Sequence, residues 1–130
     1  MEGILHMTVL KVMNLPDGCH AHLQVKVGLI MNRTRTFHRP GEREEGGGER
    51  GEFTFNGQDG TMPPMLVGME DDLSIEVIDA DDLVATSLAA VPMSTVVRDW
   101  CTGNYFWLNL GPGPGDPVKI YVCFVWCPAL

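Results

Sequence analysis

The run of residues 3–15 constrains the fold of this chain more than any other segment. Leu5, Met7 and Val9 occupy alternate positions, which is the period of a β-strand that buries one face. Val12 continues the apolar set after a small slip in this alternation, and Pro16 then ends the run. We therefore expect a long core strand close to the N-terminus, followed directly by a loop.

Further short strand patterns, separated by Gly, Pro and Asp, occupy most of the remaining sequence. This spacing is typical of a β-sandwich or barrel. Strands are predicted at 22–27, 33–38, 52–55, 73–78, 105–110 and 118–126, and one more strand with a short helical turn within 83–97. Residues 56–68 are predicted to be a turn followed by irregular structure. The pattern predicts a single all-β domain over residues 1–130, an antiparallel sandwich of about eight strands.

Composition and charge exclude several classes of protein. The 130 residues are enough for one packed core, and 45% of them are apolar. The net charge of −8 argues against nucleic acid as a partner, because binding a phosphate backbone needs basic surface. No segment is long and apolar enough for a membrane-spanning helix, and the start of the chain does not read as a signal peptide. We therefore expect a cytoplasmic protein with reduced cysteines.

Several motifs follow one another in a recognisable order. Residues 3–16 match G-x-L-x-V-x-V-x-x-A-x-x-L-P with conservative changes, residues 52–55 match N-E-x-F-x-F, and residues 73–81 match L-x-x-x-V-x-D-x-D. Together these segments resemble a C2 domain over nearly the whole chain. The resemblance implies a β-sandwich with binding loops at one end, and it is expected to be the N-terminal module of a larger protein. Because the L-x-V-x-V strand comes first, the strand order resembles the circularly permuted form, called type II.

The resemblance also implies where calcium ligands would lie. Ca²⁺ takes six to eight oxygen ligands, and calcium-binding members of the family supply about five aspartates for it. Asp17 matches the first of them, and Asp79 and Asp81 match the D-x-D pair. His20 and Ser87 stand where two further carboxylates are expected, and imidazole is a poor ligand for Ca²⁺. Two hypotheses stay open: a weakened Ca²⁺ site on the three aspartates, or aspartates that only stabilise turns.

Other residues are candidates for lipid or partner binding. Lys26, Arg33 and Arg35 fall on neighbouring predicted strands, where many C2 domains bind phosphoinositide head groups; the alternative is a solvated strand face. Leu83 and Val84 fall at the expected tip of the third loop, where apolar side chains insert into bilayers in some members of the family; the alternative is packing in the core. The acidic segment 40–51 is either a solvated insertion or a docking loop for a basic partner.

The predicted last strand is apolar on both faces, whereas a sandwich strand normally shows one face to water. Either a loop or the remainder of a longer protein covers the outer face, or the face is an interface that permits homo-oligomers. The two expected sets are Val118, Ile120, Val122, Phe124 and Trp126 on one face, and Tyr121, Cys123, Val125 and Cys127 on the other.

The sequence contains no catalytic constellation such as G-x-S-x-G or His-Glu-x-x-His, and we expect no enzyme. The first hypothesis is a non-enzymatic interaction module that needs no Ca²⁺ and no cofactor. It binds a protein partner of scaffold, ciliary or cytoskeletal type and contacts phospholipid head groups. The second hypothesis is a Ca²⁺-dependent phospholipid-binding C2 domain that uses Asp17, Asp79 and Asp81.

Overall fold

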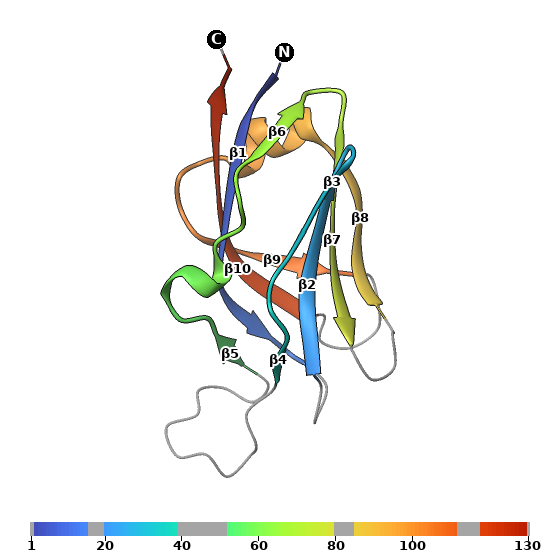
Figure 1. Cartoon of the computed structure of the whole chain (residues 1–130), viewed down its shortest axis with the longest axis vertical. Helices are drawn as coiled ribbons and strands as arrows, with labels where there is room; N and C mark the ends of the chain where they lie inside the picture. Colours follow the sequence, from blue (N-terminus) through green and yellow to red (C-terminus); the bar gives the residue numbers. More distant parts are fainter. Residues whose placement is uncertain (1, 16–19, 39–51, 80–84, 112–117, 130) are drawn as a thin grey trace.

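A computed structural model describes residues 2–15, 20–38, 52–79, 85–111 and 118–129; for residues 38, 79 and 85–89 it describes the backbone alone. These residues are mostly β-strand and form two sheets that pack face to face (Figure 1). The elements in chain order are β1 (Glu2–Met13), β2 (His20–Val27), β3 (Ile30–Arg33), β4 (Phe37–His38), β5 (Phe53–Thr54), the 3₁₀ turn η1 (Gly57–Gly60), β6 (Met65–Gly68), β7 (Asp72–Asp79), β8 (Ala85–Pro92), α1 (Met93–Thr95), the π-turn η2 (Val96–Trp100), β9 (Phe106–Leu110) and β10 (Val118–Pro128).

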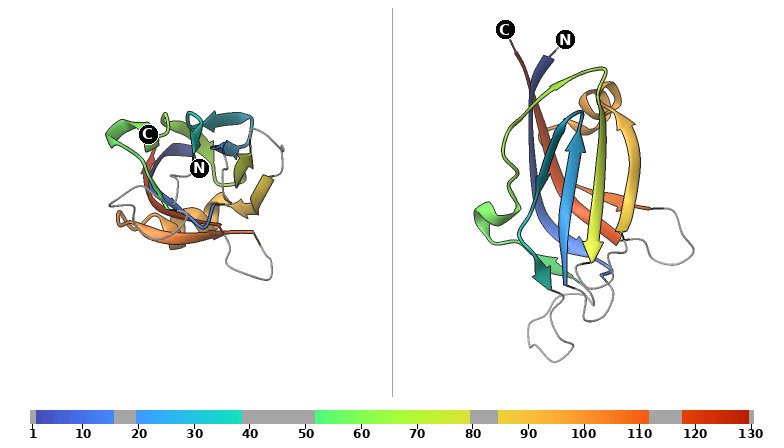
Figure 2. Two further views of the ribbon diagram at one scale, coloured as in Figure 1. Left: turned by 90° about the horizontal axis from the view of Figure 1, so that it is seen from below. Right: turned by 45° about the vertical axis from the view of Figure 1, so that its right-hand side comes forward.

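The strand pairs define two antiparallel sheets. Sheet A has the order β5-β1-β10-β9, and β6 also pairs with β1. Sheet B has the order β3-β2-β7-β8, and β4 also pairs with β2. The two sheets enclose the core, and the second view in Figure 2 shows them as separate layers along the long axis of the molecule. The predicted all-β sandwich is confirmed.

Two strand positions of the sandwich are each occupied by two short strands. Both β3 and β4 pair with the same edge of β2, and both β5 and β6 pair with the same edge of β1. The described strand segments therefore occupy about eight strand positions, as a sandwich of this kind requires. Residues 56–68 differ from the irregular segment that was predicted, because they contain η1 and β6.

The interruption between β3 and β4 has a local cause at Thr34. The backbone N–H of Leu23 donates to the hydroxyl of Thr34 over 3.1 Å, and this hydroxyl donates to the carbonyl oxygen of Arg35 over 2.9 Å. A side-chain oxygen thus takes the place that a strand carbonyl would occupy, and the ladder stops there. The continuous strand predicted over 33–38 is therefore wrong for residues 34–36.

The first and last strands of the chain are neighbours. β10 lies between β1 and β9, and its residues from Lys119 to Pro128 pair antiparallel with Met13 to Gly3 of β1. The type II order expected from the resemblance has the first and last strands of the chain adjacent in one sheet, as they are here. Both chain ends lie at the same end of the molecule (Figure 1).

A β-bulge interrupts the pairing of β1 between Val9 and Lys11, where the sequence predicted the slip. The turn η1 covers this bulge. The N–H of Phe55 donates to the carbonyl of Leu10, and the N–H of Met62 donates to the carbonyl of Met7, each over 2.9 Å. The bulge therefore positions the connection between β5 and β6 against sheet A.

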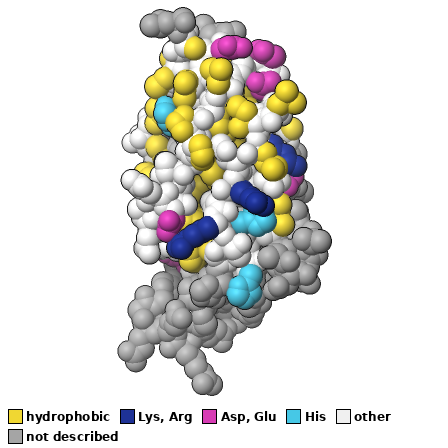
Figure 3. Space-filling view, in the orientation of Figure 1, with side chains coloured by type: hydrophobic (Ala, Val, Ile, Leu, Met, Phe, Trp, Pro, Cys, Tyr) yellow, Lys and Arg dark blue, Asp and Glu magenta, His cyan; other side chains and the backbone are white. Residues whose placement is uncertain are grey.

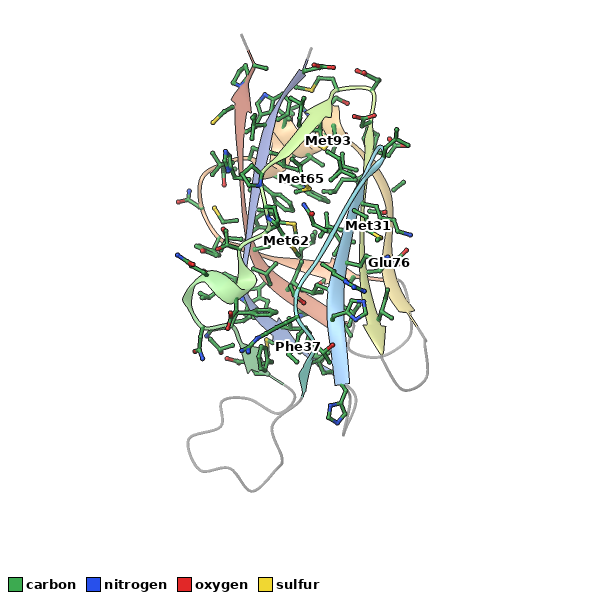
Figure 4. The ribbon with its side chains drawn as sticks, in the orientation of Figure 1. Met31, Phe37, Met62, Met65, Glu76 and Met93 are labelled. Atoms are coloured by element: carbon green, nitrogen blue, oxygen red, sulfur yellow. The ribbon has the colours of Figure 1, made fainter. Side chains whose placement is uncertain are left out.

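The core consists of the inward residues of both sheets. Figure 4 shows Met62, Met65 and Met93 between the sheets, and all three are buried. At the end where β4 and β5 lie, Phe37 stacks on Phe53 with ring centroids 4.8 Å apart. Phe55 meets both rings edge-on, at 5.3 Å from Phe37 and 5.1 Å from Phe53. Because β4 belongs to sheet B and β5 to sheet A, these three rings join the two sheets.

Candidate functional site

The strand ends that flank the expected calcium loops converge at one end of the sandwich. Ala21, near the start of β2, pairs with Asp79, the last residue of β7, and also with Phe37 of β4. Segments 16–19, 39–51 and 80–84 are therefore attached at the same end. Asp17, Asp81, Leu83 and Val84 lie outside the described residues, and only the backbone of Asp79 is described.

The described residues include no group of three or more His, Cys, Asp and Glu side chains that could hold a metal ion. Ser87, which matches a ligand position of the family, lies opposite Glu76 within the paired part of β8. His20 is exposed at the start of β2, where its backbone pairs with that of His38. No oxygen ligand replaces the expected carboxylate at residue 20.

The structure brings two of the three predicted basic residues together on the outer face of sheet B. Lys26 pairs across the ladder with Met31, and Gln24 pairs with Arg33, so Lys26 and Arg33 are diagonal neighbours on one face. Both side chains are exposed, and neither has an ion-pair partner among the described residues. We call these two residues the basic pair. Figure 3 shows the cations of this face across the middle of the molecule.

Arg35 differs from the basic pair, although the sequence grouped the three residues. It lies beyond the end of β3, and its guanidinium forms an ion pair with Asp59 of η1, with Nη2 and Oδ2 2.9 Å apart. Its charge is therefore compensated. Glu76 of β7 also reduces the positive potential of this face, although its carboxylate accepts a hydrogen bond from Gln24 over 3.3 Å. Among the described residues of sheet B, Lys26 and Arg33 are the cations without an ion-pair partner, and the carboxylates of Asp72 and Glu76 on β7 lack one as well.

An aromatic group on the outer face of sheet A was not predicted as a site. Tyr121 of β10 lies between Tyr105 and Trp107, with ring centroids 5.3 Å and 4.9 Å away. Tyr105 and Trp107 remain 39% and 42% exposed. We call these three residues the aromatic ladder. The two-sided apolar pattern of residues 118–127 signals this face, but the two more exposed rings come from the edge strand β9, which supplies Trp107, and from Tyr105 directly before it.

A hollow of about 340 Å³ adjoins the aromatic ladder, lined by Met13, Glu52, Trp107 and Lys119. Met13 and Lys119 are directly opposite each other at the ends of β1 and β10. Glu52 forms an ion pair with Lys11, with Oε1 and Nζ 3.4 Å apart, which compensates its charge. Lys119 has no such partner among the described residues, so the hollow combines apolar walls with one free ammonium group.

The fold is that of a C2 domain. Solved structures with 16–17% sequence identity match 95–97% of this chain with TM-scores of 0.67–0.68: the two C2 domains of extended synaptotagmin 2 in a calcium-bound form, and a longer piece of the same protein that includes its SMP domain. This chain spans 45% and 26% of those chains, respectively. The C2-type fold predicted from the sequence is confirmed.

A more distant structure extends the same comparison. A human GIVD cytosolic phospholipase A2, solved with an inhibitor and terbium chloride, matches 97% of this chain with 12% identity and a TM-score of 0.59. This chain spans 17% of that enzyme.

No family model and no curated protein matches the sequence. None of the helices in the described part of the chain is long and apolar enough to cross a membrane.

Proposed function

We propose that this domain is a non-enzymatic, C2-type interaction module that works in the cytoplasm without calcium. It binds a protein partner, and the basic pair on sheet B contacts the phosphorylated head groups of an anionic membrane. The observation that carries the membrane contact is the diagonal placement of Lys26 and Arg33, both exposed and both without an ion-pair partner among the described residues. Two converging cations suit a phosphate group.

Ligand chemistry supports independence from calcium. Only three of about five expected carboxylates are present at the matching positions, and Ca²⁺ affinity depends on ligand number and charge. The imidazole of His20 cannot replace a carboxylate at the second position. A module with such a site must recognise its target with other groups, and the basic pair is available for this purpose.

The magnitude of the head-group contact argues for a protein partner as well. Each cation close to an anionic membrane contributes about 1 kcal/mol, so Lys26 and Arg33 together supply about 2 kcal/mol. That corresponds to roughly a thirtyfold gain in affinity, which directs a protein to a membrane but does not hold it there. The net charge of −8 opposes the contact further. We therefore assign most of the binding energy to a protein.

Vesicle flotation tests the head-group contact. The vesicles contain phosphatidylcholine with phosphatidylserine and phosphatidylinositol bisphosphate, and the protein is compared in Ca²⁺ and in chelator. We expect equal flotation under both conditions and a loss of at least tenfold with Lys26→Gln plus Arg33→Gln. Arg98→Gln is the matched control, because this exposed arginine lies outside sheet B and is paired with Asp99. Flotation that is unchanged in the double variant would reject the contact.

One observation favours the second candidate, a Ca²⁺-dependent phospholipid-binding domain. The pairing of Ala21 with Asp79 attaches the segments that carry Asp17 and Asp81 to the same end of sheet B. Asp79→Asn together with Asp81→Asn separates the two functions. Under the calcium-dependent alternative this variant loses all flotation that requires Ca²⁺. Under our proposal it floats like the unmodified chain.

A further inference from the structure

Three of the four histidines of this chain come together on the outer face of sheet B. His20 and His22 are two residues apart on β2, where they alternate with the buried Ala21 and therefore share the outer face. His38 of β4 is directly opposite His20 in the ladder. β4 lies beside the start of β2 (Figure 1), and Figure 3 shows histidine side chains toward the lower end of this face. Two strands that are separate in the sequence thus contribute imidazoles to one place.

The backbone spacing of the three histidines suits a single metal ion. Residues two apart in a strand lie about 6.7 Å from each other, directly opposite residues about 4.5–5.5 Å, and diagonal neighbours about 7–8 Å. His20 and His38 are the opposite pair, and His22 is diagonal to His38. Aromatic side chains can meet across all three spacings. The side chain of His38 is outside the described part of the chain, so the register of β2 and β4 alone assigns its place.

The ligand type selects the kind of ion. Imidazole nitrogen suits Zn²⁺ and similar transition metals, whereas Ca²⁺ and Mg²⁺ prefer oxygen ligands. Zn²⁺ takes four ligands in tetrahedral geometry, and three imidazoles with one water molecule form a complete set. His20 is exposed, so solvent can reach the fourth position. The three histidines therefore have the ligand number and ligand type of a zinc site.

The charged side chains described near this group do not oppose a divalent cation. In the next row of the sheet, Arg33 and Glu76 are opposite Gln24 from either side, so that their charges offset each other. The guanidinium of Arg35 is already ion-paired. The net charge of the chain is −8, which attracts cations over a longer range.

We propose that His20, His22 and His38 form a binding site for one Zn²⁺ or a chemically similar divalent transition-metal ion. The ion joins the two-residue strand β4 to β2, and a ligand that binds only the folded chain stabilises it. The site goes beyond the proposed function, because neither Lys26 nor Arg33 is one of its ligands. It also differs from the calcium site that the family resemblance implies, because its ligands are nitrogens on strands and not carboxylates on loops.

Isothermal titration calorimetry of the whole chain with Zn²⁺ tests the site. We expect the unmodified chain to bind the ion. His20→Gln, His22→Gln and His38→Gln should each weaken Zn²⁺ binding at least tenfold, because each removes one of the three protein ligands. His6→Gln is the matched control, because His6 is exposed on sheet A, and it should keep the affinity. Cys19→Ser should keep the affinity as well, because the site uses no thiolate.

Thermal denaturation provides a second readout. Zn²⁺ should raise the melting temperature of the unmodified chain and leave that of the His20→Gln plus His22→Gln variant unchanged. Circular dichroism verifies that the variants fold.

Four results would overturn the inference. The first is absence of Zn²⁺ binding, and the second is an unchanged affinity in His38→Gln, because the register position of this residue completes the site. The third is weaker binding in Cys19→Ser, which would place a thiolate among the ligands. The fourth is equal weakening in His6→Gln, which would show that Zn²⁺ binds to surface histidines without a defined site.

Discussion

The carbonyl oxygen of Val9 lies directly against the Cα atom of Gly60, so that a Cβ atom at residue 60 would overlap it. Val9 precedes the bulge of β1, and Gly60 ends η1. This close approach holds the β5–β6 connection on sheet A, and only glycine permits it.

Gly60→Ala should therefore destabilise the domain by about 2 kcal/mol or more, because the obstructing atom is backbone and cannot rotate away. Urea denaturation measures the change. Gly57→Asn is the control. A Cβ atom added at residue 57 would have no other atom within 4 Å, and asparagine tolerates the positive φ of 48° at this position. Equal midpoints for the unmodified chain and Gly60→Ala would contradict the described packing.

Phe37→Ala should cost about 3–5 kcal/mol in the free energy of unfolding. The ring is buried and contacts Phe53 and Phe55, so its removal leaves a cavity where the two sheets join. Phe37→Leu retains most of the volume and should cost clearly less. Thermal denaturation of both variants provides the comparison, and a Phe37→Ala protein as stable as Phe37→Leu would show that the three-ring contact is absent.

The thiol of Cys101 should react slowly with alkylating reagents at neutral pH. Burial raises the pKa of Cys101 to about 11, and the neighbouring Cys123 acts in the same direction. Thiolate is the reactive form, so labelling of Cys101 should rise about tenfold per pH unit between pH 8 and pH 10. Mass spectrometry of peptides quantifies the reaction. Exposed Cys127 should react before Cys101 at pH 8, and the reverse order would contradict the burial.

The same pKa shift affects stability at alkaline pH. The folded state retains the proton on Cys101 longer than the unfolded state, whose thiol has its ordinary pKa of 9.0. The unfolded state therefore binds fewer protons between about pH 9 and 11, and the stabilisation is lost as the pH rises through that interval. Cys101→Ala should show a smaller decline in melting temperature over this interval. An identical decline in melting temperature for the unmodified chain and Cys101→Ala would show that Cys101 does not cause the loss of stability.

Asp59→Asn should increase binding to anionic vesicles by about fivefold, because it releases Arg35, two residues after Arg33 in the chain, from its ion pair. The pair itself is exposed, so its loss should cost no more than about 1 kcal/mol of stability. Flotation provides the measurement, and Asp59→Asn combined with Arg35→Gln is the control that should remove the gain. A gain that persists in the control would show that Arg35 does not cause it.

Much of the fold follows from the period of the apolar residues. Leu5, Met7 and Val9 mark β1, and the matching alternation in β2, β7 and β10 predicts the inward faces that the structure shows. The slip before Val12 corresponds to the bulge. These features are local, because a strand with one buried face has to alternate whatever its neighbours are.

The remaining features depend on contacts between distant residues. Thr34 ends a strand through its hydroxyl bond to Leu23, and a threonine is otherwise a good strand residue. Arg35 was grouped with the basic pair because nothing in its sequence neighbourhood indicates the ion pair with Asp59. The aromatic ladder forms only when β9 pairs with β10, so the sequence showed Tyr105 and Trp107 as strand residues without their shared exposed face.

Thermal denaturation in millimolar Ca²⁺ and in chelator tests the central claim, a C2-type module that works without calcium, most directly. A ligand that binds the folded state alone stabilises it by about 2.7 kcal/mol at one hundred times its dissociation constant, which raises the melting temperature of a domain this size by about 10 °C. The account predicts the same melting temperature in Ca²⁺, Mg²⁺ and chelator. A rise of several degrees in Ca²⁺ alone, abolished by Asp79→Asn, would contradict it.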